Sequence, residues 1–185
     1  MAVRALRKIG DPVLRRRADV VELTDLASPG FDGLVEDMVD TMRAEGGIGI
    51  AAPQIGESLR VAVIAIEPTS SRYPHMSAFP LTLFVNPRVT VTDPGEQGFW
   101  EGCLSVPNLR GYVHRPRAIR VNFEDAEGRS QWIDAEGFLA TVLQHELDHL
   151  DGVLFVDRVR DTTKLATVEN YAKYWMSNAT DPTEI

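Results

Sequence analysis

The most constraining feature of the chain is an apolar helical pattern from about Ala135 to Leu150 that also contains two histidines. Asp134 is its predicted N-cap, and Gly152 marks its end. The apolar residues cover much of the helix circumference, which predicts a central and largely buried helix. They are Phe138, Leu139, Val142, Leu143, Leu147 and Leu150. Polar side chains on such a helix need an explanation, because each buried polar group without a partner costs about 1–3 kcal/mol.

The polar residues of this helix form the pattern H-E-x-x-H, which runs from His145 to His149. Residues at i and i+4 project from one face about one turn apart, so both imidazoles can bind one divalent cation. Glu146 follows the first histidine and can reach a water on that metal without becoming a ligand. The alternative is a chance pattern on an amphipathic helix, with both histidines exposed or paired with acids. The apolar surroundings favour the metal site.

Two histidines do not complete a metal site, and the third ligand decides the class of enzyme. A third histidine is excluded at the position that one class of peptidases uses, because Phe155 stands there. Glu169 lies at a distance typical of the glutamate ligand of other zinc endopeptidases, so this class stays open. Cys103 is the remaining candidate, although a lone cysteine is often only a small buried apolar residue. An inactive metal-binding or interaction module is a further alternative.

The rest of the chain predicts an α+β fold in one catalytic domain over residues 1–185. Apolar residues at helical spacing predict an N-terminal helix from about Pro29 to Ala44, with Ser28 as N-cap. A C-terminal helix from about Thr162 to Ser177 is expected to pack on the outside as a lid, with Glu169 and Lys173 as an i,i+4 pair. Residues 68–80 are expected to form a surface loop.

Short segments rich in β-branched and aromatic residues lie between these helices and predict strands. They are Arg60–Ile66, Leu81–Asn86, Arg88–Thr92, Ala118–Phe123 and Gln131–Ile133. Their close spacing, without intervening helices, predicts antiparallel pairing. We therefore expect antiparallel β-sheets packed around the central helix that carries the two histidines.

Charge and cysteine content limit the binding partners and the cellular compartment that can be expected for this chain. The chain has 19 Lys and Arg against 27 Asp and Glu, a formal net charge of −8, so no broad surface for nucleic acid is expected. Charged residues near the start argue against a secretory signal, and no apolar run approaches the roughly 20 residues of a membrane span. Cys103 is the only cysteine, so no intrachain disulfide can form. Together these features predict a cytoplasmic protein.

Three segments together resemble the signature motifs of peptide deformylases. They read GIGIAAPQ at residues 47–54, EGCLS at residues 101–105 and QHELDH at residues 144–149. The resemblance covers the chain from about residue 3 to residue 160. It implies that Cys103, His145 and His149 are the metal ligands and that Glu146 is the general acid and base. It also implies that Gln54 and the backbone N–H of Leu104 stabilise the oxyanion, although a loop amide such as Gln54 often only bonds to backbone.

The activity implied by this resemblance is hydrolysis of the formyl group from N-formyl-L-methionyl nascent polypeptides, with release of formate. A divalent metal lowers the pKa of a bound water toward about 7, and the resulting hydroxide would attack the formyl carbon. Glu146 would take the water proton and return it to the departing amine. A thiolate among the ligands suits iron(II), zinc, nickel or cobalt, and the resemblance implies iron(II). A nascent substrate also implies transient contact with the ribosome.

The residues around the first motif suggest how a peptide would bind. Gly47 and Gly49 do not make a phosphate loop, because the third glycine and a Lys-Ser/Thr pair are missing. A segment without side chains can instead pair with an extended peptide, a role that the resemblance gives to Gly49. Arg110 is a candidate to orient the second motif or to meet substrate, unless it is simply exposed. The candidates for an apolar slot that takes the methionine side chain are Ile48, Phe99, Trp100, Leu139 and Val142.

Overall fold

The computed structural model describes residues 2–67 and 77–176, and its helices and strands form an α+β fold. The α-helices are α1 (Leu23–Leu26), α2 (Pro29–Ala44), α3 (Gly137–His149) and α4 (Val168–Tyr174). The strands are β1 (Gly49–Ala51), β2 (Val61–Ile66), β3 (Phe79–Cys103), β4 (Val106–Glu124), β5 (Ser130–Glu136) and β6 (Leu165–Thr167). Short 3₁₀ helices are η1 (Pro12–Arg15), η2 (Ala52–Ile55), η3 (Phe155–Arg158) and η4 (Thr162–Lys164).

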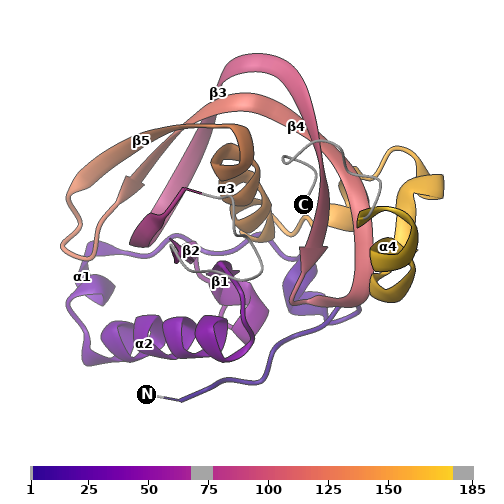
Figure 1. The fold of residues 1–185 in the computed structure, drawn as a ribbon. Coiled ribbons are helices and arrows are strands. Elements are labelled where there is room, and N and C mark those ends of the chain that lie inside the picture. Colours follow the sequence, from indigo (N-terminus) through magenta and orange to yellow (C-terminus); the bar gives the residue numbers. More distant parts are fainter. Residues whose placement is uncertain (1, 68–76, 177–185) are drawn as a thin grey trace.

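The described strands form one antiparallel sheet in the order β1-β2-β3-β4-β5, with β6 beside β4. In Figure 1 the long strands β3 and β4, together with β5, arch over α3, while β1, β2 and α2 lie below it. The expected α+β fold with antiparallel strands is therefore confirmed, with one curved sheet in place of several.

Strands β3 and β4 are much longer than the segments predicted for them. The predicted segments Leu81–Asn86 and Arg88–Thr92 are parts of β3, which continues past Pro87 because its pairing with β4 shifts register between Val85 and Arg88. Such irregularities bend a strand and increase its twist, which lets the sheet curve over a helix. Most of the predicted loop at 68–80 lies outside the described residues, but Phe79 and Pro80 already belong to β3, so its predicted end is wrong.

Helix α2 has the predicted bounds, Pro29–Ala44, and the Ser28 hydroxyl accepts a hydrogen bond from the Phe31 N–H at 3.2 Å. Helix α3 begins later than predicted, at Gly137, with Glu136 in place of Asp134 as N-cap. The reason is that the β4–β5 ladder continues to Glu136, so Asp134 stays in the strand.

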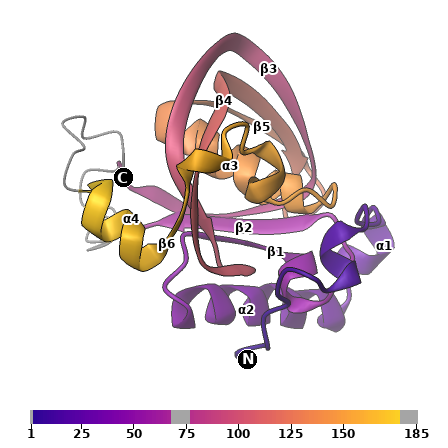
Figure 2. The same ribbon diagram turned by 90° about the vertical axis from the view of Figure 1, so that its right-hand side faces the viewer.

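The C-terminal helix is also shorter than predicted. Residues 165–167 form β6, which pairs with residues 109–111 of β4, and α4 begins only at Val168. Thr167 caps it by accepting a hydrogen bond from the Asn170 N–H at 3.2 Å. Ser177, the predicted end, lies outside the described residues. Figure 2 shows β6 and α4 on the outer side of the long strands, where the ring of Tyr171 lies 5.1 Å from that of Trp100.

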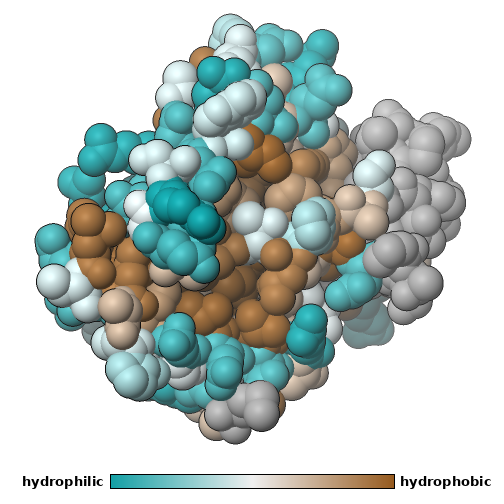
Figure 3. Space-filling view, turned by 90° about the vertical axis from the view of Figure 1, so that its left-hand side faces the viewer, coloured by the Kyte–Doolittle hydropathy of each residue, from teal (hydrophilic) through white to brown (hydrophobic). Residues whose placement is uncertain are grey.

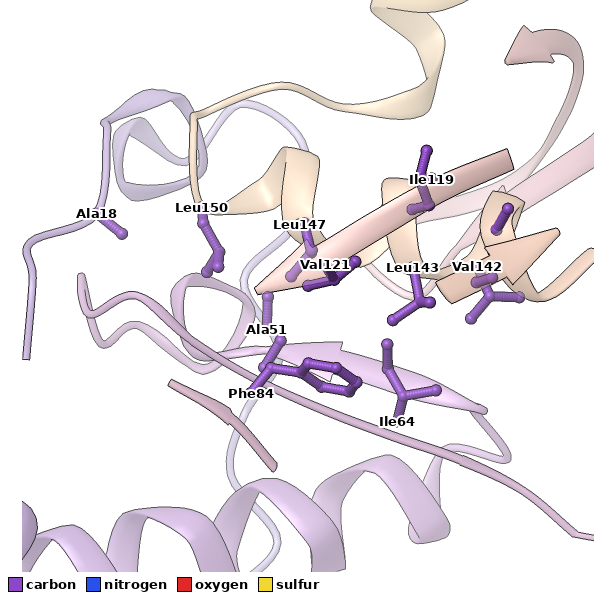
Figure 4. Close-up of a cluster of buried hydrophobic side chains, with 13 residues drawn as sticks. Ala18, Ala51, Ile64, Phe84, Ile119, Val121, Val142, Leu143, Leu147 and Leu150 are labelled. Carbon is purple, nitrogen blue, oxygen red and sulfur yellow. The ribbon is translucent and has the colours of Figure 1, made fainter. Parts of the chain in front are cut away.

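Two of the apolar core clusters lie on opposite sides of β2, whose six residues are all buried. On one face, Ala62 and Ile64 join a cluster that includes Leu143 and Leu147 of α3. Figure 4 shows these helix side chains directed toward Ile64 and Phe84, with Val121 of β4 beside them. On the other face, Val61, Val63 and Ala65 pack against the cluster that contains the buried side of α2. This packing fixes the helix that carries the two histidines against the sheet.

The surface carries both hydrophobic and hydrophilic areas (Figure 3). Figure 3 shows hydrophobic residues gathered in the middle of the face on the side of α1, with hydrophilic residues around them. Leu23 of α1 and Trp132 of β5 are among the exposed large apolar residues. Within the described ranges, no helix is both long enough and apolar enough to cross a membrane.

Candidate metal centre

Three potential metal ligands meet where the end of β3 approaches α3. One ligand atom each from Cys103, His145 and His149 can be chosen so that all three lie within 4.8 Å of one another. The Cys103 sulfur is 3.3 Å from Nε2 of His149. The structure thus brings together the three residues predicted as ligands.

Local structure explains the meeting of these side chains. His145 and His149 are one turn apart on α3, and their ring centroids are 5.3 Å apart. Cys103 is the last residue of β3, just after a register shift in the β3–β4 pairing. Its sulfur also accepts a hydrogen bond from the Ser105 N–H at 3.4 Å, which holds the sulfur against the turn between β3 and β4.

The other nitrogen of His145 is fixed by a carboxylate. Nδ1 of His145 lies 2.7 Å from Oε2 of Glu101, which is itself buried. A carboxylate acceptor holds the proton on Nδ1 and leaves the Nε2 lone pair available for a metal. Burial alone would raise the pKa of Glu101, but hydrogen bonds from Arg115 and His145 lower it to about 2. Glu101 is therefore charged at neutral pH.

Arg115 binds the carboxylate of Glu101. Its guanidinium, only 2% exposed, donates to Glu101 from Nε at 2.6 Å and from Nη2 at 2.9 Å. Nη1 donates to Asp148 at 2.8 Å. Burial would lower the pKa of Arg115, but the two carboxylates raise it, so the arginine stays charged. Sequence reasoning missed this role of Arg115, since the residue lies outside all three motifs.

The donor set fits a thiophilic divalent cation. Burial alone would raise the pKa of the Cys103 thiol, but the charge of His149 and hydrogen bonds from both histidines lower it well below its usual value. The thiolate is the form that binds metal. One thiolate and two imidazoles suit iron, zinc, nickel or cobalt, and three protein ligands are the number found in catalytic zinc sites.

Glu146 lies in the same cavity as the three ligands. The cavity of about 70 Å³ is lined by Gly47, Ile48, Gly49, Gln54, Gly102, Cys103, Leu104, His145 and Glu146. Burial raises the pKa of Glu146, and the neighbouring histidines partly oppose this shift. Its Oε2 atom is buried and has no hydrogen-bond partner among the described residues. Such an atom is positioned to bind a water molecule or a proton.

Gly49 is packed directly against this carboxylate. A Cβ at Gly49 would lie 2.6 Å from Cγ and Oε1 of Glu146, a separation that real side chains do not tolerate. The glycine predicted for peptide binding therefore also makes room for the predicted base.

Gln54 and Leu104 both face the cavity. The side-chain oxygen Oε1 of Gln54 accepts a hydrogen bond from the Ala51 N–H at 2.8 Å, which orients the side-chain amide. Its NH₂ group is 3.2 Å from the Ser105 hydroxyl and 3.6 Å from the Cys103 sulfur. The Gln54 side chain therefore bonds to the backbone and at the same time lies beside Cys103.

An apolar pocket of about 60 Å³ adjoins the ligands. It is lined by Ile48, Phe99, Trp100, Glu101, Gly102, Phe138, Thr141, Val142, His145 and Glu146. Four of the five residues predicted for the methionine slot lie there. Leu139 is not among the lining residues, and Phe138 and Thr141 line the pocket from α3.

Two further predicted residues have clear positions. Arg110 lies against the second motif, since a Cβ at Gly102 would overlap its guanidinium. Glu169 is exposed on α4 and is not part of the ligand cluster, so the structure does not support the alternative in which it is the third ligand. Lys173, its predicted partner, has its ammonium 4.8 Å from the Tyr174 ring centroid.

Comparisons with known proteins agree on one family. Residues 3–165 match the family model described as polypeptide deformylase. A peptide deformylase of Leptospira biflexa is 45% identical over 162 residues, which are 88% of this chain and 90% of that protein. Peptide deformylase 2 of Pseudomonas syringae is 42% identical over 167 residues, 90% of this chain and 93% of that protein.

Solved structures agree with these sequence matches. The crystal structure of a class I type b peptide deformylase from Acinetobacter baumannii, bound to Met-Ala-Ser, has a TM-score of 0.82 and 36% identity. It covers 85% of this chain and 99% of that one. An actinonin complex of a peptide deformylase from Synechococcus elongatus has a TM-score of 0.74 and 35% identity, covering 89% and 88% of the two chains.

Proposed function

Because the chain belongs to the peptide deformylase family, whose members remove the formyl group from nascent polypeptides, we propose that Cys103, His145 and His149 hold its metal ion and that Glu146 is its general acid and base. The observation that carries this proposal is the cluster of one thiolate and two imidazoles within 4.8 Å, next to a buried carboxylate. The exposed position of Glu169 argues against the competing endopeptidase site.

Iron(II) is the metal that we propose for the site, with zinc, nickel and cobalt as alternatives of matching chemistry. A divalent cation supplies a water ligand of lowered pKa and a positive charge for the formyl oxygen. Glu101 keeps the proton of His145 on Nδ1, so that Nε2 is a lone-pair donor.

Glu146 would move the proton. Its partner-free Oε2 can accept a hydrogen bond from the attacking water, and its raised pKa makes the carboxylate a better base at neutral pH. The same carboxyl then returns the proton to the departing amine. One residue can serve both steps because the carboxyl stays in the same cavity.

Gln54 and Leu104 would stabilise the negative charge that develops on the formyl oxygen. The Gln54 NH₂ group is held near Cys103, and Leu104 lines the same cavity, where its backbone N–H would be the second donor. Each such donor contributes about 2.7–4 kcal/mol of transition-state stabilisation in comparable enzymes.

The peptide would bind along β1, which lies at the end of the sheet order and pairs only with β2 among the described strands. An edge strand can add an extended peptide through backbone hydrogen bonds, and we assign this role to Ile48 and Gly49. The methionine side chain would enter the pocket formed with Phe99, Trp100 and Val142. Because the Acinetobacter protein was crystallised with Met-Ala-Ser, we propose formyl-Met-Ala-Ser as a test substrate. A nascent substrate also leads us to propose transient ribosome contact and action in the cytoplasm.

Metal binding by two variants tests the ligand set. Cys103→Ser should lose most of its affinity for Co²⁺, because the serine hydroxyl stays protonated, whereas Glu169→Gln should bind as wild type. Competition with a chromophoric chelator gives the dissociation constant of Co²⁺ for each variant. Full affinity in Cys103→Ser, or a large loss in Glu169→Gln, would contradict the assignment.

The base is tested separately. Glu146→Ala loaded with nickel should bind the metal but lose formate release by about 10²- to 10⁴-fold. Unchanged activity would point to another base and contradict the mechanism.

A further inference from the structure

The short helix η3, which follows α3, places one exposed arginine at the end of a hydrogen-bonded path to the metal centre. Arg158, whose side chain is 44% exposed, binds Asp148 through Nε and Nη2. Oδ2 of Asp148 also accepts a hydrogen bond from Nη1 of the buried Arg115 at 2.8 Å. Asp148 therefore joins a surface arginine to a buried one.

The path continues inward without a gap. Arg115 holds both carboxylate oxygens of Glu101, and Oε2 of Glu101 lies 2.7 Å from Nδ1 of His145. Every step after the first joins groups that are buried or nearly so. Each bidentate contact also fixes the plane of a carboxylate, because a guanidinium presents its donors in a rigid fork. The orientation of the His145 ring thus depends on carboxylates that arginines hold in place.

The same short helix touches His145 a second time. The ring of Phe155, 1% exposed, is stacked on the imidazole with centroids 6.2 Å apart and an interplanar angle of 18°. Asp157 anchors η3 by accepting a hydrogen bond from the Leu154 N–H at 2.8 Å and by pairing with Arg15. Phe155 and Arg158 are therefore both connected to one ring, the first by direct contact and the second through a chain of hydrogen bonds.

We propose that Arg158 is a positioning residue of the metal centre, which acts on His145 through Asp148, Arg115 and Glu101. This proposal rests on the proposed role of His145 as a ligand. Arg158 is exposed and is assigned no contact with metal or substrate, yet it sets part of the affinity for the metal.

The experiment compares two exposed arginines, each of which holds one carboxylate through two hydrogen bonds. Arg158→Gln removes the bidentate partner of Asp148. Arg120→Gln removes an equally exposed arginine, also 44%, that holds Asp134 through two hydrogen bonds on β4 and β5, away from the ligands. The dissociation constant of Co²⁺ is measured by chelator competition, and the visible spectrum of the saturated protein reports the ligand geometry. Thermal unfolding of both metal-free variants records the purely structural cost.

Direct partners of metal-binding histidines typically change affinity by about 10- to 100-fold when mutated. Arg158 lies further out, so Arg158→Gln should weaken Co²⁺ binding by about 3- to 10-fold, while Arg120→Gln should leave it unchanged. Arg158→Lys should recover part of the loss, since lysine keeps the charge but not the fork. Equal affinities of Arg158→Gln and Arg120→Gln would overturn the proposal.

A double-mutant cycle tests the route. In an Asp148→Asn background, Arg158→Gln should have little further effect, because the link that it acts through is already weakened. The same loss in both backgrounds would show that Arg158 acts independently of Asp148, and would overturn the proposal. Failure of the ligand set is a separate result, since it is recognised by full Co²⁺ affinity in Cys103→Ser whatever Arg158 does.

Discussion

Replacement of Gly49 by alanine tests the placement of the base most sharply. The new Cβ would lie 2.6 Å from Cγ and Oε1 of Glu146, whereas ordinary contacts begin near 3.4 Å. The Glu146 side chain must therefore move by about 0.8 Å. A misplacement of about 1 Å can cost about 10²-fold in rate, which is about 2.7 kcal/mol of transition-state stabilisation.

The displaced atoms belong to the Glu146 side chain and none to the backbone, so we expect the fold to accommodate the change. We expect Gly49→Ala to bind metal and unfold at nearly the wild-type temperature, while kcat for formate release from formyl-Met-Ala-Ser falls about 10²-fold and KM changes little. Gly33→Ala on α2 is the matched control, because a Cβ there meets nothing within 4 Å. It should keep full activity and gain up to about 1 kcal/mol of stability.

The outcome distinguishes two functions of the glycine. If Gly49 served only to admit the peptide backbone, the loss would be in KM, and kcat at saturation would be preserved. Activity of Gly49→Ala within about twofold of wild type would show that Glu146 does not need its present position, and would refute the reasoning.

Three further predictions concern stability and ionisation. Arg115→Met removes the buried cation from two carboxylates, one of them the buried Glu101, and should lower the free energy of unfolding by about 3–5 kcal/mol in urea titrations; a loss below 1 kcal/mol would contradict the buried network. Ser28→Ala removes the N-cap of α2 and should cost about 0.5–2 kcal/mol by thermal unfolding, so an unchanged midpoint would count against the cap. Burial alone would raise the pKa of Asp125, but hydrogen bonds from Arg129 and its neighbours lower it to about 2, below its ordinary 3.8. Asp125 therefore stabilises the fold above about pH 4, and this contribution is lost as the pH falls through about 2; a carboxyl NMR titration with a midpoint near 3.8 would disprove it.

Features set by local geometry could be predicted from the sequence. The Ser28-Pro29 start of α2 follows from capping, and the pairing of His145 and His149 follows from helical spacing, so both agree with the structure. The choice of Cys103 over Glu169 was open from spacing alone and depended on resemblance to the deformylase motifs. In the structure, Cys103 and not Glu169 lies beside the two histidines.

Features set by strand pairing could not be predicted. Asp134 is a good N-cap residue, but the β4–β5 ladder retains it, and Arg120 stands opposite it. Leu165 has a helix-compatible pattern around it, yet it pairs with Gly111 of β4. In both places, hydrogen bonds with β4 outweighed the local propensity.

The network behind His145 was missed for the same reason. Arg115 lies on β4, at a position whose inward direction is known only from the register with β3. A local signal did exist, since Glu101 and Asp148 are charged residues inside two of the motifs, and Asp148 lies on the helix that was expected to be buried. A charged carboxylate that is buried requires a partner of opposite charge, but the sequence does not say which arginine provides it.

The most direct test of the account is the release of formate and free amine from formyl-Met-Ala-Ser, with protein purified without oxygen and loaded with iron(II) or nickel. The acetyl analogue and Glu146→Ala are the controls. The account predicts rapid release from the formyl peptide, little from the acetyl peptide, and a loss of about 10²- to 10⁴-fold in the variant. No release from the formyl peptide by protein with metal bound at Cys103, His145 and His149 would contradict it.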